Sequence, residues 1–285
     1  MSVKLELQNV SYYYGKGTAF EVKALDQVNF CVTAGSITGL IGHTGSGKST
    51  LAQLFNGLEK PTEGKVLLDG CDIWDKKYNG KRICFRVGLV MQYPEYQLFE
   101  ETVFADIAFG PRNMGLGEDE IKARVMNAIE FVGLKPEILK ESPFDLSGGQ
   151  KRRVAIAGIM AMQPEILVLD EPAAGLDPSG RAEIFGGIKR YRDDTGATVL
   201  IVSHSMEDMA EYCDDIIVMH RGKVLQTGPK TEIFADTDSL IQAGLDIPQI
   251  TRVMQILAQN GLKVNAAACT KEQAMAEILA AMQHK

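Results

Sequence analysis

The sequence lacks any apolar run that approaches the roughly 20 residues a helix needs to cross a bilayer. Its first residues, Met1–Glu6, do not include the apolar core of a signal peptide. These two absences argue against a membrane-spanning chain and against secretion, so we expect a protein that stays in the cytosol. The composition is that of an ordinary globular protein, and 285 residues suffice for one large domain with an appendage.

Cysteine is scarce, and basic residues are fewer than acidic ones. The five cysteines are scattered, odd in number and never spaced Cys-x-x-Cys, which favours free reduced thiols. The formal net charge of −7 argues against a protein that coats nucleic acid, although a local basic patch stays open. We therefore expect no nucleic-acid partner.

A glycine-rich segment at residues 42–50 is the most informative part of the sequence. The apolar run before it, residues 37–41, predicts a buried strand, and the apolar residues after it repeat at helical spacing. Glycines let successive backbone amides converge on an anion, and a helix start adds its dipole. This order predicts a phosphate-binding loop, with a glycine turn that binds nothing as the alternative. The loop residues are Gly42, His43, Thr44, Gly45, Ser46, Gly47, Lys48, Ser49 and Thr50, and the helical positions are Leu51, Leu54, Phe55 and Leu58.

Two side chains of this loop have distinct expected roles. Lys48 would reach the β- and γ-phosphates of a nucleotide, and Ser49 would place its hydroxyl on Mg²⁺. The motif by itself indicates no more than a P-loop NTPase.

Upstream of the loop the sequence predicts β-structure. Residues 3–10 alternate apolar and polar, and residues 22–33 predict further strands, so a β-rich edge precedes the parallel core. The three tyrosines Tyr12, Tyr13 and Tyr14 offer an aromatic face on which a base could stack. Tyrosines that pack on a sheet are the alternative.

An acidic pair follows the apolar segment 166–169. Four apolar residues in a row predict a parallel strand buried on both faces, and open α/β sheets bind ligands at the carboxyl ends of such strands. Asp170 would hold Mg²⁺, and Glu171 would orient or deprotonate the attacking water. An acidic pair that only caps a loop is the alternative.

Polar residues also end two other short apolar segments. Residues 87–91 predict a buried strand that ends in Gln92, whose neutral amide could contact a metal-bound water. Residues 197–203 predict another strand, followed by His204. Alone, each of these residues is weak evidence, and a structural or surface histidine is the commoner case. Because His204 shares its position at a strand end with Gln92 and Glu171, we expect it to point at the γ-phosphate.

The region of about 93–165 predicts an inserted helical subdomain, because glycine and proline bracket short segments of helical spacing. It ends in Leu146-Ser147-Gly148-Gly149-Gln150, a glycine turn that opens a helix and forms a second anion-binding helix start. A Ser-capped helix with flexible glycines is the alternative.

Past residue 228 the composition shifts, and two amphipathic helices are predicted. The first follows Pro248 and the second follows Thr270, which together with Gln273 resembles a capping box. Their apolar faces need a cover, either from the same chain or from a dimer partner. The apolar positions are Ile250, Val253, Met254 and Leu257 in the first helix, and Met275, Ile278, Leu279 and Met282 in the second.

Over about residues 3–230 these features resemble the nucleotide-binding subunit of ABC transporters. In that family's terms, residues 42–50 resemble the Walker A motif and residues 166–171 the Walker B motif. Gln92 matches the Q-loop, residues 175–178 with Asp177 match the D-loop, and His204 matches the switch histidine.

The signature is the most specific element of the resemblance. Residues 146–150 lie twenty residues before Asp170, and other P-loop enzymes lack this motif. By position, Tyr14 resembles the family's adenine-stacking aromatic more than Tyr12 or Tyr13 does. The implied fold is an α/β P-loop NTPase of ABC type with a β-rich N-terminal edge, an inserted helical subdomain and a small C-terminal helical extension.

Within ABC proteins the chain is most similar to the A-prime ATPase of energy-coupling factor (ECF) transporters, which import vitamins and transition-metal ions. Four segments carry this resemblance, and Ala173, where most ABC proteins have Ser or Thr, is a small departure. Residues 231–285 fit the family's C-terminal extension, which is implicated in pairing two ATPases. The four segments are 92–99, 108–111, 144–157 and 175–181.

The resemblance implies an ATPase with ATP and Mg²⁺ as cofactors, bound peripherally at the cytoplasmic face of the cell membrane. Its expected partners are a second ECF-type ATPase, a transmembrane coupling subunit and membrane substrate-binding subunits. A-prime similarity favours a heterodimer over a homodimer. In a head-to-tail dimer each ATP would lie between the P-loop of one subunit and the signature of the other.

Three other functions compete with this interpretation. A soluble ABC ATPase that acts on ribosomes or DNA would usually carry a coiled-coil insertion or two cassettes, and neither is present. A degenerate ATP-binding scaffold is disfavoured by intact Lys48, Glu171 and His204. The ATPase of another ABC importer differs from the ECF type mainly in family resemblance.

Overall fold

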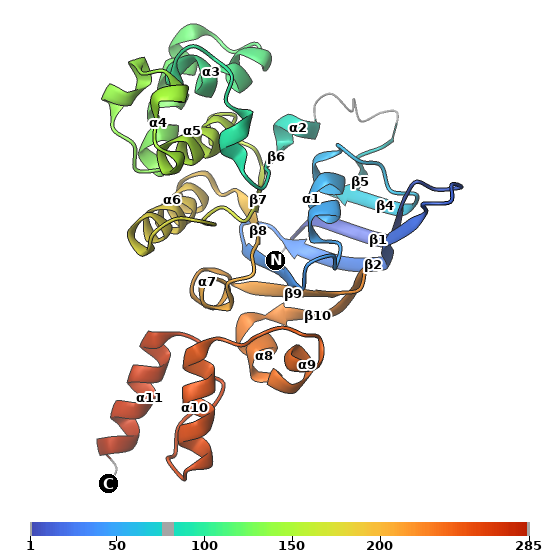
Figure 1. Ribbon diagram of the computed structural model, residues 1–285, viewed down its shortest axis with the longest axis vertical. Helices are drawn as coiled ribbons and strands as arrows, with labels where there is room; N and C mark the ends of the chain where they lie inside the picture. Colours follow the sequence, from blue (N-terminus) through green and yellow to red (C-terminus); the bar gives the residue numbers. More distant parts are fainter. Residues whose placement is uncertain (1, 76–82, 284–285) are drawn as a thin grey trace.

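The computed structural model describes residues 2–75 and 83–283 and has the α/β architecture expected from the sequence (Figure 1). Two β-sheets form the centre, a group of helices lies beyond one end of the sheets, and the C-terminal helices extend from the opposite end. The figure shows an elongated molecule whose C-terminus lies far from the helical group. No helix within the described residues combines the length and the apolar character needed to cross a membrane.

The larger sheet is mostly parallel. Five of its strands run in one direction, and only the edge strand β10 is antiparallel to its neighbour. The carboxyl ends of the five parallel strands therefore meet at one edge of the sheet. In spatial order the strands are β10 (Lys223–Pro229), β9 (Asp215–His220), β3 (Ile37–Gly42), β8 (Thr198–Val202), β7 (Ile166–Asp170) and β6 (Val87–Val90).

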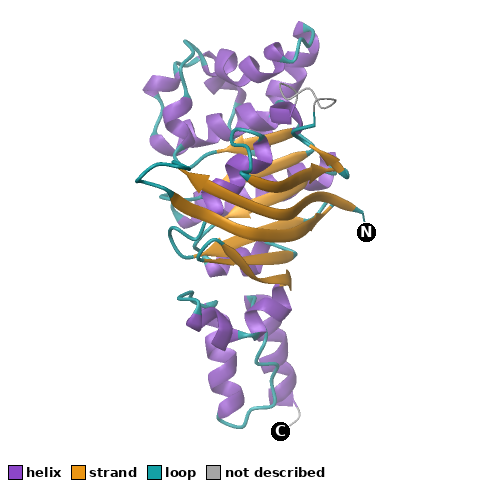
Figure 2. Ribbon diagram, turned by 90° about the vertical axis from the view of Figure 1, so that its right-hand side faces the viewer, coloured by secondary structure: helices purple, strands orange, loops and turns teal. Residues whose placement is uncertain are grey.

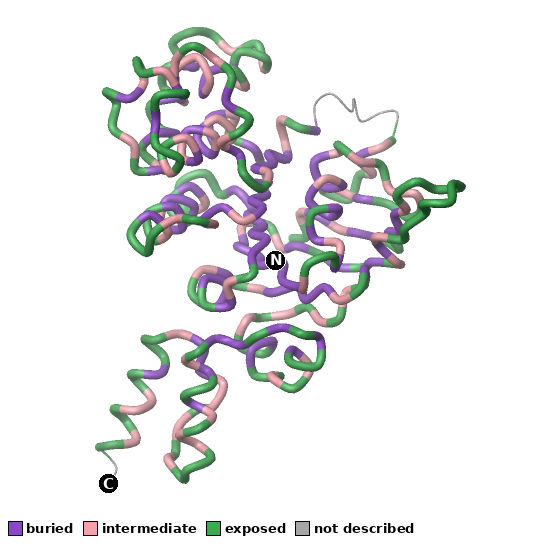
Figure 3. The backbone as a smooth tube through the Cα atoms, in the orientation of Figure 1, coloured by how far each residue is buried: buried purple, intermediate pink, exposed green. Residues whose placement is uncertain are grey.

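Both faces of this sheet are covered, which explains why its central strands are mostly apolar. Side chains alternate between faces along β7. Leu167 and Leu169 pack in the core that contains the helices of the inserted group, whereas Ile166 and Val168 pack in the core beneath the smaller sheet. Every residue of β3, β6, β7 and β8 is buried (Figure 3).

The smaller sheet is antiparallel and forms the predicted β-rich edge (Figure 2). Helix α1 (Lys48–Asn56) packs between the two sheets through Leu51, Leu54 and Phe55. Because Gly57 adopts a left-handed conformation and caps the helix, α1 ends before Leu58, which is exposed. The sequence prediction of Leu58 as a helical core position is therefore wrong. The strands, in spatial order, are β2 (Val22–Thr33), β1 (Val3–Tyr14), β4 (Glu63–Leu68) and β5 (Cys71–Asp72).

Helices occupy the chain between β6 and β7, as expected for the inserted subdomain. Helix α5 packs against both α3 and α4. Helix α2 (Ile83–Arg86) leads into β6. The inserted elements are the 3-10 helix η2 (Pro94–Gln97), α3 (Val103–Asn113), α4 (Glu118–Phe131), the 3-10 helices η3 (Pro136–Lys140) and η4 (Pro143–Asp145), and α5 (Gly148–Met160). Helices α6 (Pro178–Thr195) and α7 (Met206–Tyr212) follow β7 and β8.

Four helices make up the C-terminal extension as far as residue 283, and the last two form a small core of their own. Met254, Ala268 and Ala274 are its buried residues. Met254 packs in this core, whereas Val253, on the same predicted apolar face of the first helix, is 45% exposed, so the chain itself covers only part of that face. The helices are α8 (Lys230–Ala235), α9 (Thr237–Gln242), α10 (Gln249–Gln259) and α11 (Lys271–Gln283).

The predicted capping box at the start of α11 is only half formed. The Thr270 hydroxyl accepts a hydrogen bond from the backbone N–H of Gln273 at 3.3 Å. The Gln273 side chain accepts instead from the backbone N–H of Cys269, at 3.1 Å. Thr270 thus caps the helix as the pattern predicts, and only the reciprocal bond of the Gln273 side chain reaches one residue further back.

Candidate functional site

The ends of three parallel strands and the P-loop enclose one cavity of about 400 Å³. The parallel sheet creates this arrangement, because β6, β7 and β8 all deliver their following residues to the same edge. The cavity therefore gathers residues that are far apart in the sequence. Its lining includes Tyr14, Thr44, Gly45, Gly47, Lys48, Ser49, Thr50, Gln92, Asp170, Glu171 and His204.

The P-loop runs from β3 to α1 in a conformation that depends on glycine. Gly47 has a φ of 103°, and a Cβ at this residue would lie 2.6 Å from the Leu25 side chain. Lys48 donates hydrogen bonds from Nζ to the carbonyls of Gly42 and His43, at 2.7 and 3.1 Å. Burial lowers the pKa of Lys48, and the charges of Asp170 and Glu171 oppose that shift. A buried cation thus lies beside the loop amides, as phosphate binding requires.

Ser49 and Asp170 form an oxygen-rich corner of the cavity. The Ser49 hydroxyl donates to Asp170 Oδ2 at 2.9 Å. Burial raises the pKa of Asp170, and the hydrogen bond from Ser49 acts in the opposite direction. Together with the Gln92 amide, these groups offer the hard oxygen ligands that Mg²⁺ prefers, so the residues fit this cation.

Glu171 sits at a backbone turn directly after β7. Its φ of 53° lies in the left-handed region, which is uncommon for glutamate, and its N–H donates to the Val202 carbonyl at 2.9 Å. Ser203 donates to Glu171 Oε2 at 3.4 Å, and His204 Nε2 lies 3.3 Å from Oε1. The latter contact is too poorly aligned to satisfy Oε1 as a hydrogen bond.

Burial, followed by the neighbouring Asp170 charge, raises the pKa of Glu171 to about 7. The pKa of His204 is lowered, first by its partial burial and then by the Lys48 charge. Both shifts disfavour the charged forms, so the two side chains are not a strong ion pair. A carboxyl group with a pKa near neutrality can accept a proton from water and release it again.

Of the three tyrosines in β1, only Tyr14 reaches the cavity. Its hydroxyl is 3.0 Å from Thr50 Oγ1 in α1, and the residue stays 42% exposed. Tyr12 is buried and donates to Glu59 at 2.6 Å. The ring of Tyr13 lies beneath the ammonium groups of Lys16 and Lys23. The contact with Thr50 thus holds the Tyr14 ring in place, and the ring stays partly exposed at the cavity.

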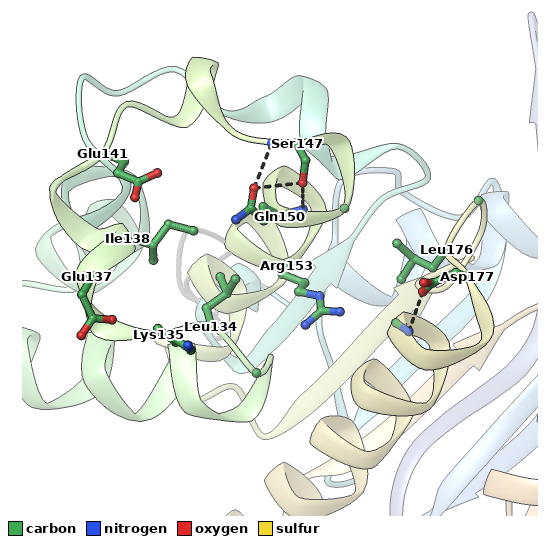
Figure 4. Close-up of a pocket in the computed structure, with 14 residues that line it drawn as sticks. Leu134, Lys135, Glu137, Ile138, Glu141, Ser147, Gln150, Arg153, Leu176 and Asp177 are labelled. Carbon is green, nitrogen blue, oxygen red and sulfur yellow. Dashed lines mark hydrogen bonds between the residues drawn. The ribbon is translucent and has the colours of Figure 1, made fainter.

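The signature residues lie in a different cavity, of about 630 Å³ (Figure 4). Ser147 and Gln150 form a capping box at the start of α5, in which the Gln150 side chain accepts from the Ser147 N–H at 3.0 Å. Asp177 caps α6 by accepting from the Gly180 N–H at 2.7 Å, on the opposite wall in the figure. Arg153 lies between these walls.

The structure places most of the predicted residues in one of these two cavities. Ser147, Gly149, Gln150 and Asp177 line the second, and Gly148 is exposed beside them. Gly42, His43 and Ser46 line neither. Ser46 is fully buried, and its backbone N–H donates to the His43 carbonyl at 3.1 Å.

Sequence reasoning missed several residues of the first cavity. Val22, Lys23 and Ala24 line it from β2. The pairing of β1 with β2, which sets Tyr14 opposite Val22, brings them there. Ser203, which contacts Glu171, was also missed, although its place one residue before His204 at a strand end was a usable signal.

Comparison with known proteins agrees with this architecture. The family model described as ABC transporter matches residues 25–174, more than half of the chain. An energy-coupling factor transporter ATP-binding protein EcfA2 from Caldanaerobacter subterraneus subsp. tengcongensis is 52% identical, with 96% of each chain covered. The protein of the same name from Clostridium tetani is 49% identical over 100% of this chain and 99% of its own.

Solved structures give the same result. CbiO1 from Clostridium perfringens, described as part of the ABC transporter complex CbiONQ, has a TM-score of 0.75 and 38% identity over 90% of this chain and 100% of its own. A dimeric ATP-binding cassette in a post-hydrolysis state, bound to ADP and Pi, has a TM-score of 0.70 and 28% identity over 79% of this chain and 98% of its own.

These matches define the class first and then the subclass. The fold and the family model are those of the ATP-hydrolysing subunits of ABC transporters. The relatives that match over nearly the full length define a narrower group within this class. The chain belongs to the family of energy-coupling factor transporter ATP-binding proteins. The predicted fold class and the predicted family are confirmed.

Proposed function

We propose that this chain binds and hydrolyses ATP to drive an ECF-type importer of vitamins or transition-metal ions at the cytoplasmic face of the membrane. The observation that carries the proposal is the first cavity, where Lys48, Ser49, Asp170, Glu171 and His204 meet at the edge of the parallel sheet. Membership in the ECF ATP-binding family supports the transport role.

The nucleotide would lie along the first cavity with its base at Tyr14 and its phosphates at the P-loop. The backbone amides of Thr44, Gly45 and Gly47 and the ammonium of Lys48 would hold the phosphates. Ser49, Gln92 and Asp170 would hold Mg²⁺, which neutralises charge on the phosphates when it is bound.

Glu171 is the proposed general base, and His204 would stabilise the γ-phosphate. With a pKa raised to about 7, the Glu171 carboxylate is better matched to accept a proton from water than an ordinary glutamate. Ser203 donates a hydrogen bond to one oxygen of the Glu171 carboxylate, and the other oxygen faces His204.

The two separate cavities support a composite site made by two ATPase chains. A P-loop cavity and a signature cavity that share no lining residue cannot hold the same nucleotide within one chain. Ser147, Gly148, Gly149, Gln150 and Asp177 would therefore meet a nucleotide held by a second ECF-type ATPase. We favour a heterodimer, with a homodimer as the alternative.

We divide the chain into a nucleotide-binding domain, residues 1–230 with its helical subdomain at about 93–165, and a dimerisation extension, residues 231–285. The last two residues of the extension lie outside the described part of the chain. Exposed apolar side chains on α10 and α11 support a role in pairing. They are Val253, Ile256, Met275, Leu279 and Met282.

A third cavity fits the expected contact with a transmembrane coupling subunit. It is a largely apolar groove of about 350 Å³ next to η2, lined by Leu98, Phe99 and Phe109 among others. Reversing the charge of Glu95 is not a clean test of this contact. Glu95 makes an internal ion pair with the buried Arg152, so the reversal would also disturb the fold. Phe109→Ala is the better probe, because Phe109 is 42% exposed in the groove.

The proposal is tested by tagging the chain, solubilising native membranes gently and identifying the co-purifying proteins by mass spectrometry. We expect a transmembrane coupling protein, a second ATPase and small membrane proteins that bind substrates. Lys48→Ala, which removes the buried cation of the P-loop, should weaken ATP binding by the same complex. Recovery with ribosomes or DNA would point to a soluble ABC ATPase, and recovery with a periplasmic-type binding protein to another importer class.

A further inference from the structure

A buried ion pair joins the helical group to the segment that follows Gln92. The guanidinium of Arg152, a residue only 4% exposed, donates from Nη2 to Glu95 Oε1 at 2.9 Å and from Nε to Oε2 at 3.1 Å. Two parallel hydrogen bonds of this kind fix the orientation of both groups as well as their separation. The pair therefore holds η2 and α5 in one relative position.

Each partner lies close to a different part of the proposed ATPase machinery. Glu95 is three residues after Gln92, which lines the P-loop cavity. Tyr93, between them, has a φ of 58°, an uncommon conformation for tyrosine that surrounding contacts must hold. Arg152 is in the second turn of α5, five residues after the cap residue Ser147. The ion pair thus links the strand-end amide of one cavity to the signature of the other.

The same two elements also form two walls of the apolar groove, whose remaining lining comes largely from α2 and α3. Gln97 and Leu98 line it from the side of η2, and Ala155 and Ile159 line it from α5. A membrane partner seated in the groove contacts both walls. Because the ion pair ties the walls together, such a contact moves them as one body instead of separating them.

Stability alone does not explain a charged pair at this position. Burying a guanidinium and a carboxylate carries a desolvation cost, and apolar residues of similar volume are often no less stabilising in such places. Arg152 Nη1 is buried and has no hydrogen-bond partner within the described residues, so the fit is not optimised for stability. Unlike an apolar pair, the ion pair fixes the orientation of η2 relative to α5.

We infer that Glu95 and Arg152 are positioning residues that keep the signature end of α5 aligned with the Gln92 segment, so that groove contact and ATP hydrolysis stay coupled. The inference rests on the proposed function. Neither residue touches the nucleotide site of its own chain, since neither lines the P-loop cavity. Their loss therefore affects turnover in the assembled complex and spares ATP binding by the P-loop.

The test uses the complete complex purified with its membrane partners and compares three forms of this chain. Glu95→Gln removes one charge, and the pair Glu95→Met with Arg152→Met replaces the ion pair by apolar side chains that preserve folding. Glu120→Gln is the matched control, because Glu120 pairs with Arg124 in the same helical subdomain and neither residue lines the two cavities or the groove. For each form the kcat and KM for ATP and the thermal midpoint are measured.

We expect the double-Met form to keep its thermal midpoint within a few degrees and to lose about tenfold in kcat, with KM changed less than about twofold. Glu95→Gln should lower kcat in the same direction, and Glu120→Gln should match the unaltered complex. A double-Met form that turns over ATP at the unaltered rate would overturn the inference, as would equal losses in Glu120→Gln. Failure of the unaltered complex to hydrolyse ATP would instead contradict the proposed function itself.

Discussion

The hydroxyl of Ser49 donates to the carboxylate of Asp170 at 2.9 Å, which joins the start of the P-loop helix to the end of β7 across 121 residues of sequence. The bond links the two motifs proposed to hold Mg²⁺. Because Asp170 is largely buried, loss of this donor would leave its charge poorly compensated.

This contact predicts that Ser49→Ala raises the Mg²⁺ concentration needed for ATP turnover by about 10- to 100-fold, the usual effect of disturbing a metal's ligand shell. Ser49→Thr keeps the hydroxyl and is the control. Turnover is measured against Mg²⁺ concentration at fixed ATP. If the alanine and threonine variants need the same Mg²⁺ concentration, Ser49 is not a ligand.

The environment of Glu171 predicts that Glu171→Gln binds ATP normally and hydrolyses it about 10²- to 10⁴-fold more slowly, because a general base typically contributes that much. Glutamine keeps the size of the side chain and the contact with Ser203. Phosphate release and nucleotide affinity are measured on the same preparation. Turnover close to that of the unaltered protein would remove Glu171 from the role of base.

The placement of the strand-end residues was predictable because all of them stand at the ends of three short apolar strands. Asp170, Glu171, Gln92 and His204 follow short buried segments, and parallel strands bring such positions together. The P-loop and the strand pattern indicated an α/β P-loop NTPase, and the family resemblance supplied the ABC type of that fold. Family resemblance supplied the separation of signature and P-loop between two chains, which no local pattern shows.

The parts that the sequence did not reveal depend on long-range contacts. Val22 and Lys23 reach the nucleotide cavity only through the register of β1 and β2, which contains irregular shifts. The Glu95–Arg152 pair joins residues 57 positions apart, and no sequence pattern at either residue predicts its partner. Leu58 kept the helical spacing but lies past a glycine cap, because spacing alone does not locate the end of a helix.

A surface network around Glu165 predicts acid sensitivity of folding. Arg86 and Lys4 both contact this carboxylate, and these contacts, led by the hydrogen bond from Arg86, lower the pKa of Glu165 to about 2 from an ordinary 4.5. A carboxyl group with a lowered pKa stabilises the fold fully above pH 4.5 and loses that contribution as the pH falls toward 2.

We therefore expect Glu165→Gln to reduce the free energy of unfolding by about 1 kcal/mol at neutral pH, a value discounted because the carboxylate is 42% exposed. The difference from the unaltered protein should shrink as the pH falls below about 4. Urea unfolding at neutral and acidic pH measures both quantities. A difference that grows toward acid pH would contradict the assigned direction of the pKa shift.

The open face of Tyr14 predicts that Tyr14→Ala weakens ATP binding by about 2- to 12-fold, equivalent to the ~0.5–1.5 kcal/mol of an aromatic pair. Tyr14→Phe keeps the ring and loses only the contact with Thr50, so its affinity should stay close to that of the unaltered protein. Tyr13→Ala is the matched control, because the Tyr13 ring lies beneath Lys16 and Lys23 and does not line the cavity. Affinities are measured by titration with a fluorescent ATP analogue. A larger loss for Tyr13→Ala than for Tyr14→Ala would place the base on the neighbouring tyrosine, on the other face of the strand.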